Sequence, residues 1–377
     1  MLCFLGEREK GNLSGRRSPI SDENYVEGSQ TGATIQVKQY TPEDIKAMTR
    51  NFSDKKRVAE NKFARLYKCS PQKGEFVAVK QLKPEAIQEE SKFMAQIRIM
   101  ERANHPNLNP LLGYCCTKDF QTLVFKFAQN NNLSCHLHSK FGLSWDNRVK
   151  IAIGVARALS YLHNECDPPI AHKDIKPANI LLSSTFEAQV SDFGFTKLED
   201  MANPVLFTWT LETPEYIAPE FEAGFNLTEK SDVYSFGIVL IEILSGRIPK
   251  RSMYDENLCI ESWAKEHMKV ALETGNFSKL VDSKLQGAYN EDDVYKMVEA
   301  IAKCILVRSE ARPTMEEVLN ILQGEANRNY RLVRSERSLK RDAVLRLGRK
   351  HFKENKERYD KERYDERHKH KAVCCYR

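Results

Sequence analysis

Residues 170–182 read I-A-H-K-D-I-K-P-A-N-I-L-L, which places Asp174, Lys176 and Asn179 directly before an apolar run. The run at 180–182 predicts a short buried strand, which would fix the preceding polar loop from below. Taken alone, the stretch is also consistent with an ordinary exposed polar loop followed by a strand of the core. A short motif is specific only in its context, so its meaning depends on the sequence around it.

Further motifs lie on both sides of this stretch in one order. The sequence V-A-V-K stands upstream at 77–80, and D-F-G, A-P-E, D-V-Y-S-F-G and R-P follow at 192–194, 218–220, 232–237 and 312–313. Together with H-K-D at 172–174, they resemble the signature of the protein kinases. The chain is most similar to plant receptor-like kinases of the Pelle type, in particular to cytoplasmic members that lack an ectodomain.

The resemblance implies an α+β, two-lobed protein kinase fold, with a small β-rich N-lobe and a large helical C-lobe. We expect the kinase domain at about 40–323, with the N-lobe at about 52–124 and the C-lobe at about 131–323. Residues 1–39 are polar and rich in Gly, Ser and charge, so we expect them to be disordered. Residues 324–377 form a basic, charged tail.

In a kinase, Asp174 would accept the proton of the incoming hydroxyl group, and Lys176 would lie near the transferring phosphate. Asn179 and Asp192 would hold Mg²⁺, a hard cation that prefers oxygen ligands. Lys80 ends a buried Val/Ala strand and would contact the phosphates, because an unpaired ammonium group is costly to bury. The resemblance therefore implies that the chain binds ATP and Mg²⁺ and that these side chains carry phosphoryl transfer.

The resemblance also implies an adenine slot with apolar faces. Its residues would be Val58, Leu66 and Ala78 above the ring, Leu181 below it, and Phe125 at the back of the pocket. Phe127 belongs to the hinge at 126–128, whose backbone atoms would bond to adenine. Plain core packing is the alternative interpretation of these apolar side chains.

The hairpin expected to cover the nucleotide departs from the family pattern G-x-G-x-x-G. The matching residues 59–64 read A-E-N-K-F-A, so the glycine loop is degenerate. Glycine serves there because backbone N–H groups approach phosphates closely and φ must be free. Ala59 and Ala64 add only a methyl group each, and Asn61 tolerates a left-handed φ. We expect a hairpin that binds phosphates less well; a hairpin without a nucleotide role is the alternative.

Four further residues depart from the family pattern around the expected site. Gln96 stands where the family has the helix Glu that pairs with Lys80, and a neutral amide brings no charge. Lys173 replaces an Arg that makes a two-pronged bond to a phosphorylated activation segment, and it offers only a point charge. Glu212 and Glu215 replace glycines and add negative charge beside the expected substrate slot.

Other residues in this half of the chain have expected structural or regulatory roles. Glu220 should form a buried ion pair with Arg312, and Asp232 should brace the backbone of the loop that contains Asp174. Thr213 matches the Thr that favours Ser/Thr acceptors in this group of kinases. Thr208, Thr210 and Thr213 are candidates for a phosphorylation that would order the segment through Lys173.

The composition suits a soluble globular protein, with 41% hydrophobic and 29% charged residues. The ten Cys contain no C-x-x-C pair, and charge at 7–10 stops the first apolar run short of a signal sequence. We therefore expect reduced thiols and a cytoplasmic location. The apolar run 236–244 is too short to span a bilayer and predicts a buried central helix.

The tail is the basic part of the chain. Residues 325–377 hold 18 Lys and Arg against 9 Asp and Glu, a net charge of +9, whereas the whole chain carries +6 and residues 1–324 therefore −3. One interpretation is a solvated helix or coil. The other is peripheral binding to the inner leaflet of the plasma membrane, through basic charge and acylation of Cys374 and Cys375. No aromatic-basic platform is present, so nucleic-acid binding is not expected.

Two functions follow from these patterns. The first is a weak Ser/Thr protein kinase that acts on protein substrates or receptor kinase partners. The alternative is a pseudokinase, a signalling adaptor or scaffold. Loss of the glycine loop and of one ion pair would remove about 2–5 kcal/mol of transition-state stabilisation. That loss slows catalysis but leaves the reacting groups in place, which narrowly favours the kinase; the sequence predicts neither its substrate nor its oligomeric state.

Overall fold

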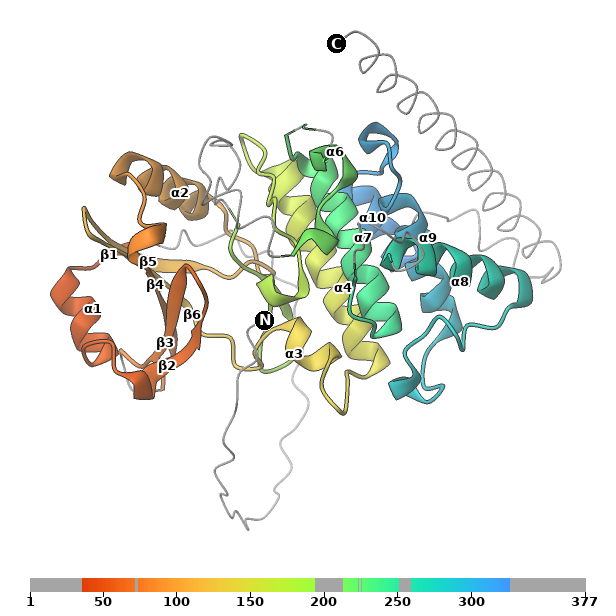
Figure 1. Cartoon of the computed structure of the whole chain (residues 1–377), viewed down its shortest axis with the longest axis horizontal. Helices are drawn as coiled ribbons and strands as arrows, with labels where there is room; N and C mark the ends of the chain where they lie inside the picture. Colours follow the sequence, from red (N-terminus) through yellow and green to blue (C-terminus); the bar gives the residue numbers. More distant parts are fainter. Residues whose placement is uncertain are drawn as a thin grey trace, which may run out of the picture.

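The computed structural model describes residues 36–71, 74–193, 213–222, 224, 226–250 and 259–325. A β-sheet lobe lies beside a larger helical lobe (Figure 1). This arrangement is the two-lobed fold that the sequence predicts. Several expectations fall on residues outside those described: the part at 1–35 of the disorder expected at 1–39, the tail beyond 325, and the roles of Gly194, Thr208, Thr210, Glu212, Cys374 and Cys375. Residues 38–39 lie in the range expected to be disordered, but they form strand β1.

The N-lobe is built on a six-stranded sheet in the order β1-β5-β6-β4-β3-β2. Its strands are β1 Lys38–Gln39, β2 Arg57–Glu60, β3 Ala64–Cys69, β4 Val77–Leu82, β5 Leu111–Thr117 and β6 Phe120–Lys126. β1 pairs with β5 in parallel, and the other pairs are antiparallel. The sheet therefore extends beyond both ends of the range 52–124 expected for this lobe.

Two helices cover opposite faces of this sheet (Figure 1). Helix α1, Pro42–Thr49, buries Ile45 in a cluster with Val79. Helix α2, Glu90–Arg102, buries Phe93 in the main core together with Ala78. Ala78 and Val79 point to opposite faces because side chains alternate along a strand. The face that carries Ala78 also carries Lys80, two residues further on.

The C-lobe is helical. Its helices are α3 Leu133–Leu137, α4 Trp145–Ser160, α6 Pro219–Glu222, α7 Glu229–Ser245, α8 Ile260–Thr274, α9 Glu291–Cys304 and α10 Met315–Gln323. Helix α7 is buried along nearly its whole length, which confirms the predicted central helix. A Cβ at Gly237 would lie 2.8 Å from Cys304 Cβ, so glycine allows α7 and α9 to pack closely. None of the described helices is long and apolar enough to cross a membrane.

A two-stranded sheet lies under the junction of the lobes. β7, Ile180–Leu182, pairs antiparallel with β8, Ala188–Val190, and Ile180 and Leu182 are buried. The predicted strand at 180–182 is therefore confirmed. Asn107 ties the sheet to the N-lobe side, because its Nδ2 donates to Ala188 O and its carbonyl oxygen accepts from Val190 N.

Candidate active site

The polar residues of the loop at 172–179 converge on Asp174. Lys176 Nζ lies 3.0 Å from Asp174 Oδ1, and Asn179 Nδ2 donates to Asp174 Oδ2 at 2.8 Å. The same Asn179 amide also donates to the backbone oxygen of Asp174, at 2.8 Å. Lys176 reaches in addition to Thr213 Oγ1, at 3.3 Å. The loop therefore presents a carboxylate whose position is fixed by an amide and an ammonium group.

Asp232, from helix α7, holds the backbone of this loop. Its carboxylate accepts from His172 N at 2.6 Å and from Lys173 N at 2.7 Å, and His163 Nε2 lies 2.9 Å from the same group. Asp232 is only 1% exposed, so these bonds are made away from water. Both backbone bonds are those expected from the sequence, and they set the direction in which Asp174 leaves the loop.

Two non-glycine residues of the site have left-handed backbone conformations. Lys173 has φ 66° and Asp192 has φ 64°. This region is unfavourable for residues with a Cβ and persists only where the surroundings enforce it, commonly at functional sites. Asp232 enforces it at Lys173 through the bond to the backbone nitrogen. The conformation marks these two residues as parts of a constrained site.

Lys80 and Asp192 join the two lobes. Lys80 Nζ lies 2.7 Å from Asp192 Oδ1. Lys80 belongs to β4 of the N-lobe, and Asp192 follows β8 by two residues. Asp192 is next to Asn179, because Ser191 N donates to Asn179 O at 2.9 Å. The pair at 80 and 192 therefore adjoins the group around Asp174, and both lie at the junction between the sheet and the helices.

The oxygen atoms in this region suit a hard cation. Asn179 directs its amide nitrogen to Asp174, which leaves Oδ1 for a cation, and Asp192 supplies a carboxylate nearby. The described residues contain no group of three or more His, Cys, Asp or Glu able to hold a metal ion. Such a donor set fits Mg²⁺ that is shared with phosphate oxygens and water, rather than held in a cage made only of protein.

Gln96 makes a contact that the sequence does not reveal. It is buried on α2, and its Nε2 donates to Gln88 Oε1 at 2.8 Å. Gln121 holds Gln88 in turn, through a bond from its Nε2 to Gln88 O at 2.7 Å. Gln96 Oε1 accepts no hydrogen bond from any residue that the structure describes. Gln96 is thus turned toward Gln88, while Lys80 pairs with Asp192.

Most residues expected to form the adenine slot share one face of the N-lobe sheet. Leu66 lies directly opposite Lys80 in the β3–β4 ladder, and Ala78 lies opposite Phe125 in the β4–β6 ladder. Residues directly opposite each other project to the same face, so these four side chains lie together. Leu181 is half-buried on β7, in the C-lobe.

The strand registers do not assign Val58 and Phe127 to this face. Val58 falls in an irregular part of the β2–β3 ladder, between Arg57 and Ala59, so the register does not fix its direction. Phe127 donates its backbone N–H to Phe76 O at 3.1 Å, and Lys68 Nζ lies 4.7 Å from the centre of its ring. A ligand at the hinge would therefore have to use neighbouring backbone groups rather than this N–H.

Residues 52–322 match the protein kinase domain family. The chain is 39% identical over 324 residues to the proline-rich receptor-like protein kinase PERK13 of Arabidopsis thaliana, covering 85% of this chain and 44% of that protein. It is 40% identical over 294 residues to PERK3 of the same plant, covering 77% and 57%. The chain thus spans about half the length of these relatives.

A solved structure is similar as well. The pseudokinase domain of BIR2, an immune regulator of the RLK/Pelle family, superposes with a TM-score of 0.61 at 28% identity. The superposition covers 76% of this chain and 86% of that domain.

Proposed function

Because the chain belongs to the protein kinase domain family, we propose that it binds Mg-ATP and transfers the γ-phosphoryl group to Ser or Thr of proteins, with weakened activity. One observation carries this proposal. The Lys80–Asp192 pair and the group around Asp174 adjoin at the junction of the lobes, although they come from distant parts of the chain. Phosphoryl transfer requires mainly such positioning and neutralisation of charge.

Each of these side chains has a role that its contacts support. Asp174 is held by Asn179 and takes the proton of the acceptor hydroxyl. Lys176 and Lys80 would offset negative charge on the phosphates, and Asn179 and Asp192 would hold the metal. Mg²⁺, when bound with ATP, neutralises charge that develops on the β- and γ-phosphate oxygens.

The adenine ring is assigned to the face that carries Leu66, Ala78 and Phe125. Leu181 closes this slot from the C-lobe, and Val58 and Phe127 stand at its edges. Thr213 contacts Lys176 of the loop at 172–179, at 3.3 Å, which supports a Ser/Thr acceptor lying beside this pair.

A pseudokinase that acts as an adaptor or scaffold is the second candidate. The buried Gln96 carbonyl, which accepts no hydrogen bond from the described residues, favours it, because Gln96 makes no bond to Lys80. The structurally similar domain of BIR2, a member of the RLK/Pelle family, is itself a pseudokinase. In this alternative, the fold would bind receptor kinase partners without transferring phosphate.

Nucleotide binding with and without Mg²⁺ tests the proposal. Saturating Mg-ATP is expected to raise the melting temperature of the purified protein by about 2–6 °C, because a ligand of the folded state stabilises it. Labelled phosphate should then appear on the protein itself or on a basic protein substrate. A thermal shift without any label would favour the adaptor, and the absence of both would refute nucleotide binding.

Replacing Gln96 with Glu is expected to raise the transfer rate about 3- to 10-fold. Gln96 and Phe93 are both buried on α2, and Phe93 belongs to the same core cluster as Ala78, which shares its face of β4 with Lys80. A carboxylate there would add the charge that the amide lacks. Steady-state kinetics would measure the effect, with Ala95→Glu as the control that adds the same charge on the exposed side of α2. An unchanged rate for Gln96→Glu would mean that Asp192 already holds Lys80 well enough.

The tail remains a separate proposal that rests on its sequence. The kinase domain would occupy about 40–323. The basic tail at 324–377 would then bring the protein to the cytoplasmic face of the plasma membrane. Replacing Cys374 and Cys375 with Ser is expected to move most of the protein from the membrane fraction to the soluble fraction, because one lipid plus basic charge suffices for anchoring. Cell fractionation measures this, and an unchanged distribution would refute anchoring by these cysteines.

A further inference from the structure

The turn between β2 and β3 is closed by the side chain of Asn61. Asn61 Oδ1 accepts hydrogen bonds from Phe63 N at 2.9 Å and from Ala64 N at 2.7 Å. Asn61 N in turn donates to Ala64 O at 3.0 Å. The side-chain carbonyl therefore accepts from two consecutive backbone N–H groups of the hairpin.

These N–H groups lie where phosphates would be expected. Leu66 is opposite Lys80 in the β3–β4 ladder, and Ala64 is two residues nearer the turn, about 7 Å along the strand. A triphosphate that contacts Lys80 could span that distance. Backbone N–H groups that point at one acceptor form a binding concavity for anions. Here the acceptor is an oxygen of the chain itself.

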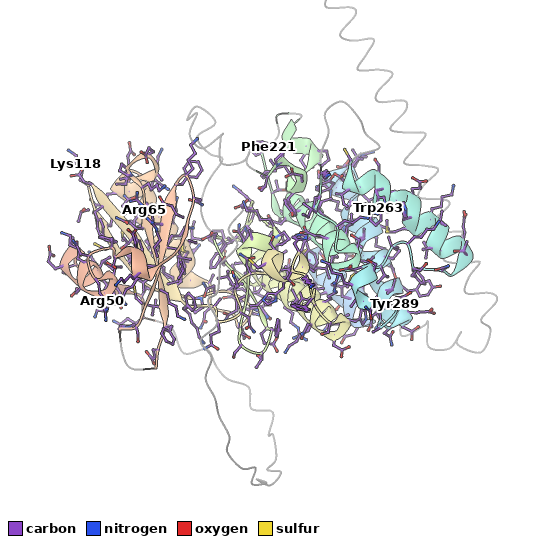
Figure 2. All side chains as sticks on the ribbon, turned by 60° about the horizontal axis from the view of Figure 1, so that its bottom comes forward. Arg50, Arg65, Lys118, Phe221, Trp263 and Tyr289 are labelled. Carbon is purple, nitrogen blue, oxygen red and sulfur yellow. The ribbon has the colours of Figure 1, made fainter. Side chains whose placement is uncertain are left out.

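The turn is also held in place from outside. Phe63 is buried in the main core, and its carbonyl oxygen accepts from Lys83 N at 2.8 Å. Glu60 binds Lys83 at 2.6 Å and Arg65 at 3.2 Å (Figure 2 shows Arg65 on the N-lobe). The Glu60 carboxylate thus neutralises cations that would otherwise attract phosphate to the hairpin. The burial of Phe63 and the ion pairs of Glu60 together keep the turn closed.

The backbone does not require asparagine at this position. The sequence suggested that Asn61 was suited to a left-handed φ, but Asn61 is not among the residues with positive φ. Alanine could therefore replace it without backbone strain. The specific property of Asn61 in this structure is its carbonyl acceptor.

We propose that Asn61 is a specificity-determining residue that competes internally with nucleotide phosphates for the N–H groups of Phe63 and Ala64. This inference rests on the proposed nucleotide site. As a consequence, the hairpin contributes little to phosphate binding, and affinity comes from the base slot and from Lys80. Wild-type protein should then bind Mg-ATP, Mg-ADP and adenosine with dissociation constants within about tenfold of one another.

Asn61→Ala tests this competition, with calorimetry on Mg-ATP and on adenosine. Removing the acceptor should tighten Mg-ATP binding about 5- to 20-fold and leave adenosine unchanged, because only the phosphates can use the released N–H groups. Asn61→Asp keeps both hydrogen bonds and adds a negative charge, so it should weaken Mg-ATP binding and again spare adenosine. The two variants therefore move the ratio of affinities in opposite directions.

Asn276→Ala is the matched control. Asn276 Oδ1 accepts from Ser278 N at 3.0 Å in a turn of the C-lobe, so its loss has a similar local cost but no route to the nucleotide. Hydrogen exchange provides a second readout, since the amides of residues 63 and 64 should exchange faster in Asn61→Ala and become protected by Mg-ATP only in that variant.

Three results would overturn the inference. If wild type binds Mg-ATP and Asn61→Ala binds it no better, Asn61 does not compete, and the proposed kinase function still stands. If Asn61→Ala binds ATP and adenosine equally more tightly, the effect is a general change of the lobe rather than release of phosphate-binding groups. If neither protein binds any nucleotide, both this inference and the proposed function fail.

Discussion

Replacing Asp174 with alanine is expected to lower the rate of phosphoryl transfer about 10²- to 10⁴-fold, the usual contribution of a positioned general base. Asp174 Oδ2 is bonded to Asn179 and its Oδ1 to Lys176, so the carboxylate is held in one orientation at the junction of the lobes. Binding of Mg-ATP should survive, because Lys80 and Asp192 are left unchanged. Transfer of label from ATP and the thermal shift by Mg-ATP measure the two effects separately.

Two further variants make this result interpretable. Asp174→Asn keeps the size of the side chain and an oxygen that can accept from Asn179, but it cannot take a proton, so it should lose as much activity as alanine. Asp119→Ala removes an exposed carboxylate between β5 and β6 and should behave like wild type. If wild type and Asp174→Ala were equally inactive while Mg-ATP still raised the melting temperature, the adaptor function would replace the kinase. If Asp174→Ala were as active as wild type, Asp174 would not be the base.

The fold could be predicted from the sequence because several of its motifs contain residues that bond to one another, such as Asp232 and the loop at 172–174. Asp232 can satisfy two backbone N–H groups of the loop at 172–174, and the structure shows both bonds. The apolar run at 180–182 has one use in a compact domain, as a buried strand, and it forms β7. The family match and the relatives among receptor-like kinases confirm the resemblance as well.

The details of the site could not be predicted in the same way. Amide side chains both donate and accept, so the sequence could not decide whether Gln96 faces Lys80 or Gln88. It faces Gln88. From the sequence, Asn61 could be expected to serve a left-handed backbone conformation. In the structure, its side-chain oxygen instead accepts two backbone hydrogen bonds. The direct contact of Lys80 with Asp192 depends on how the two lobes meet, which no local pattern records.

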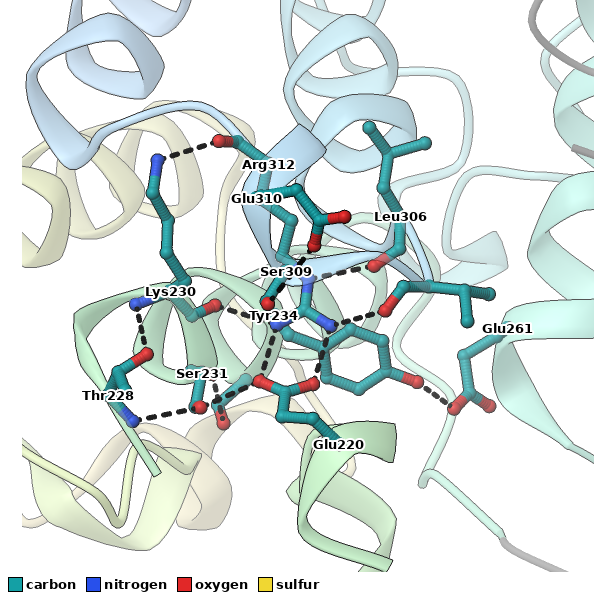
Figure 3. Close-up of polar contacts among 12 residues, drawn as sticks. Glu220, Thr228, Lys230, Ser231, Tyr234, Glu261, Leu306, Ser309, Glu310 and Arg312 are labelled. Atoms are coloured by element: carbon teal, nitrogen blue, oxygen red, sulfur yellow. Dashed lines mark hydrogen bonds and ion pairs between the residues drawn. The ribbon is translucent and has the colours of Figure 1, made fainter. Parts of the chain in front are cut away.

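Arg312 forms a buried ion pair with Glu220, as the sequence predicts, and the pair ties α6 to the segment before α10 (Figure 3). Its Nη1 and Nη2 donate to the two carboxylate oxygens at 2.8 and 2.7 Å, and Ser231 Oγ donates to the same carboxylate at 2.7 Å. Arg312 also donates to Leu306 O and Lys230 O, at 2.7 and 2.9 Å. Arg312 is only 2% exposed, and these hydrogen bonds replace the water that its guanidinium group would otherwise contact.

The pair should give stability that depends on pH. Burial raises the pKa of Glu220, but hydrogen bonds from Arg312 and Ser231 outweigh burial and hold the pKa below its ordinary value of 4.5. A carboxyl group whose pKa is depressed in the folded state stabilises the protein fully above its unfolded pKa, and this stabilisation is lost as pH falls through the folded pKa. The contribution of the pair should therefore be complete near neutral pH and decline below about pH 4.5.

Arg312→Met is expected to lower the free energy of unfolding by about 3–5 kcal/mol, because it leaves the Glu220 carboxylate, whose side chain is only 13% exposed, without its charged partner. The melting temperature should fall by roughly 6–15 °C at pH 7. Arg308→Ala is the matched control, since it removes an Arg from an exposed pair with Glu310 in the same segment and should cost at most about 1 kcal/mol. Denaturant unfolding of the three proteins at pH 7 and pH 4 measures both the loss and its dependence on pH. Equal stability of Arg312→Met and Arg308→Ala at pH 7 would mean that the buried pair contributes no more than a surface one, and that α6 is held by its apolar contacts instead.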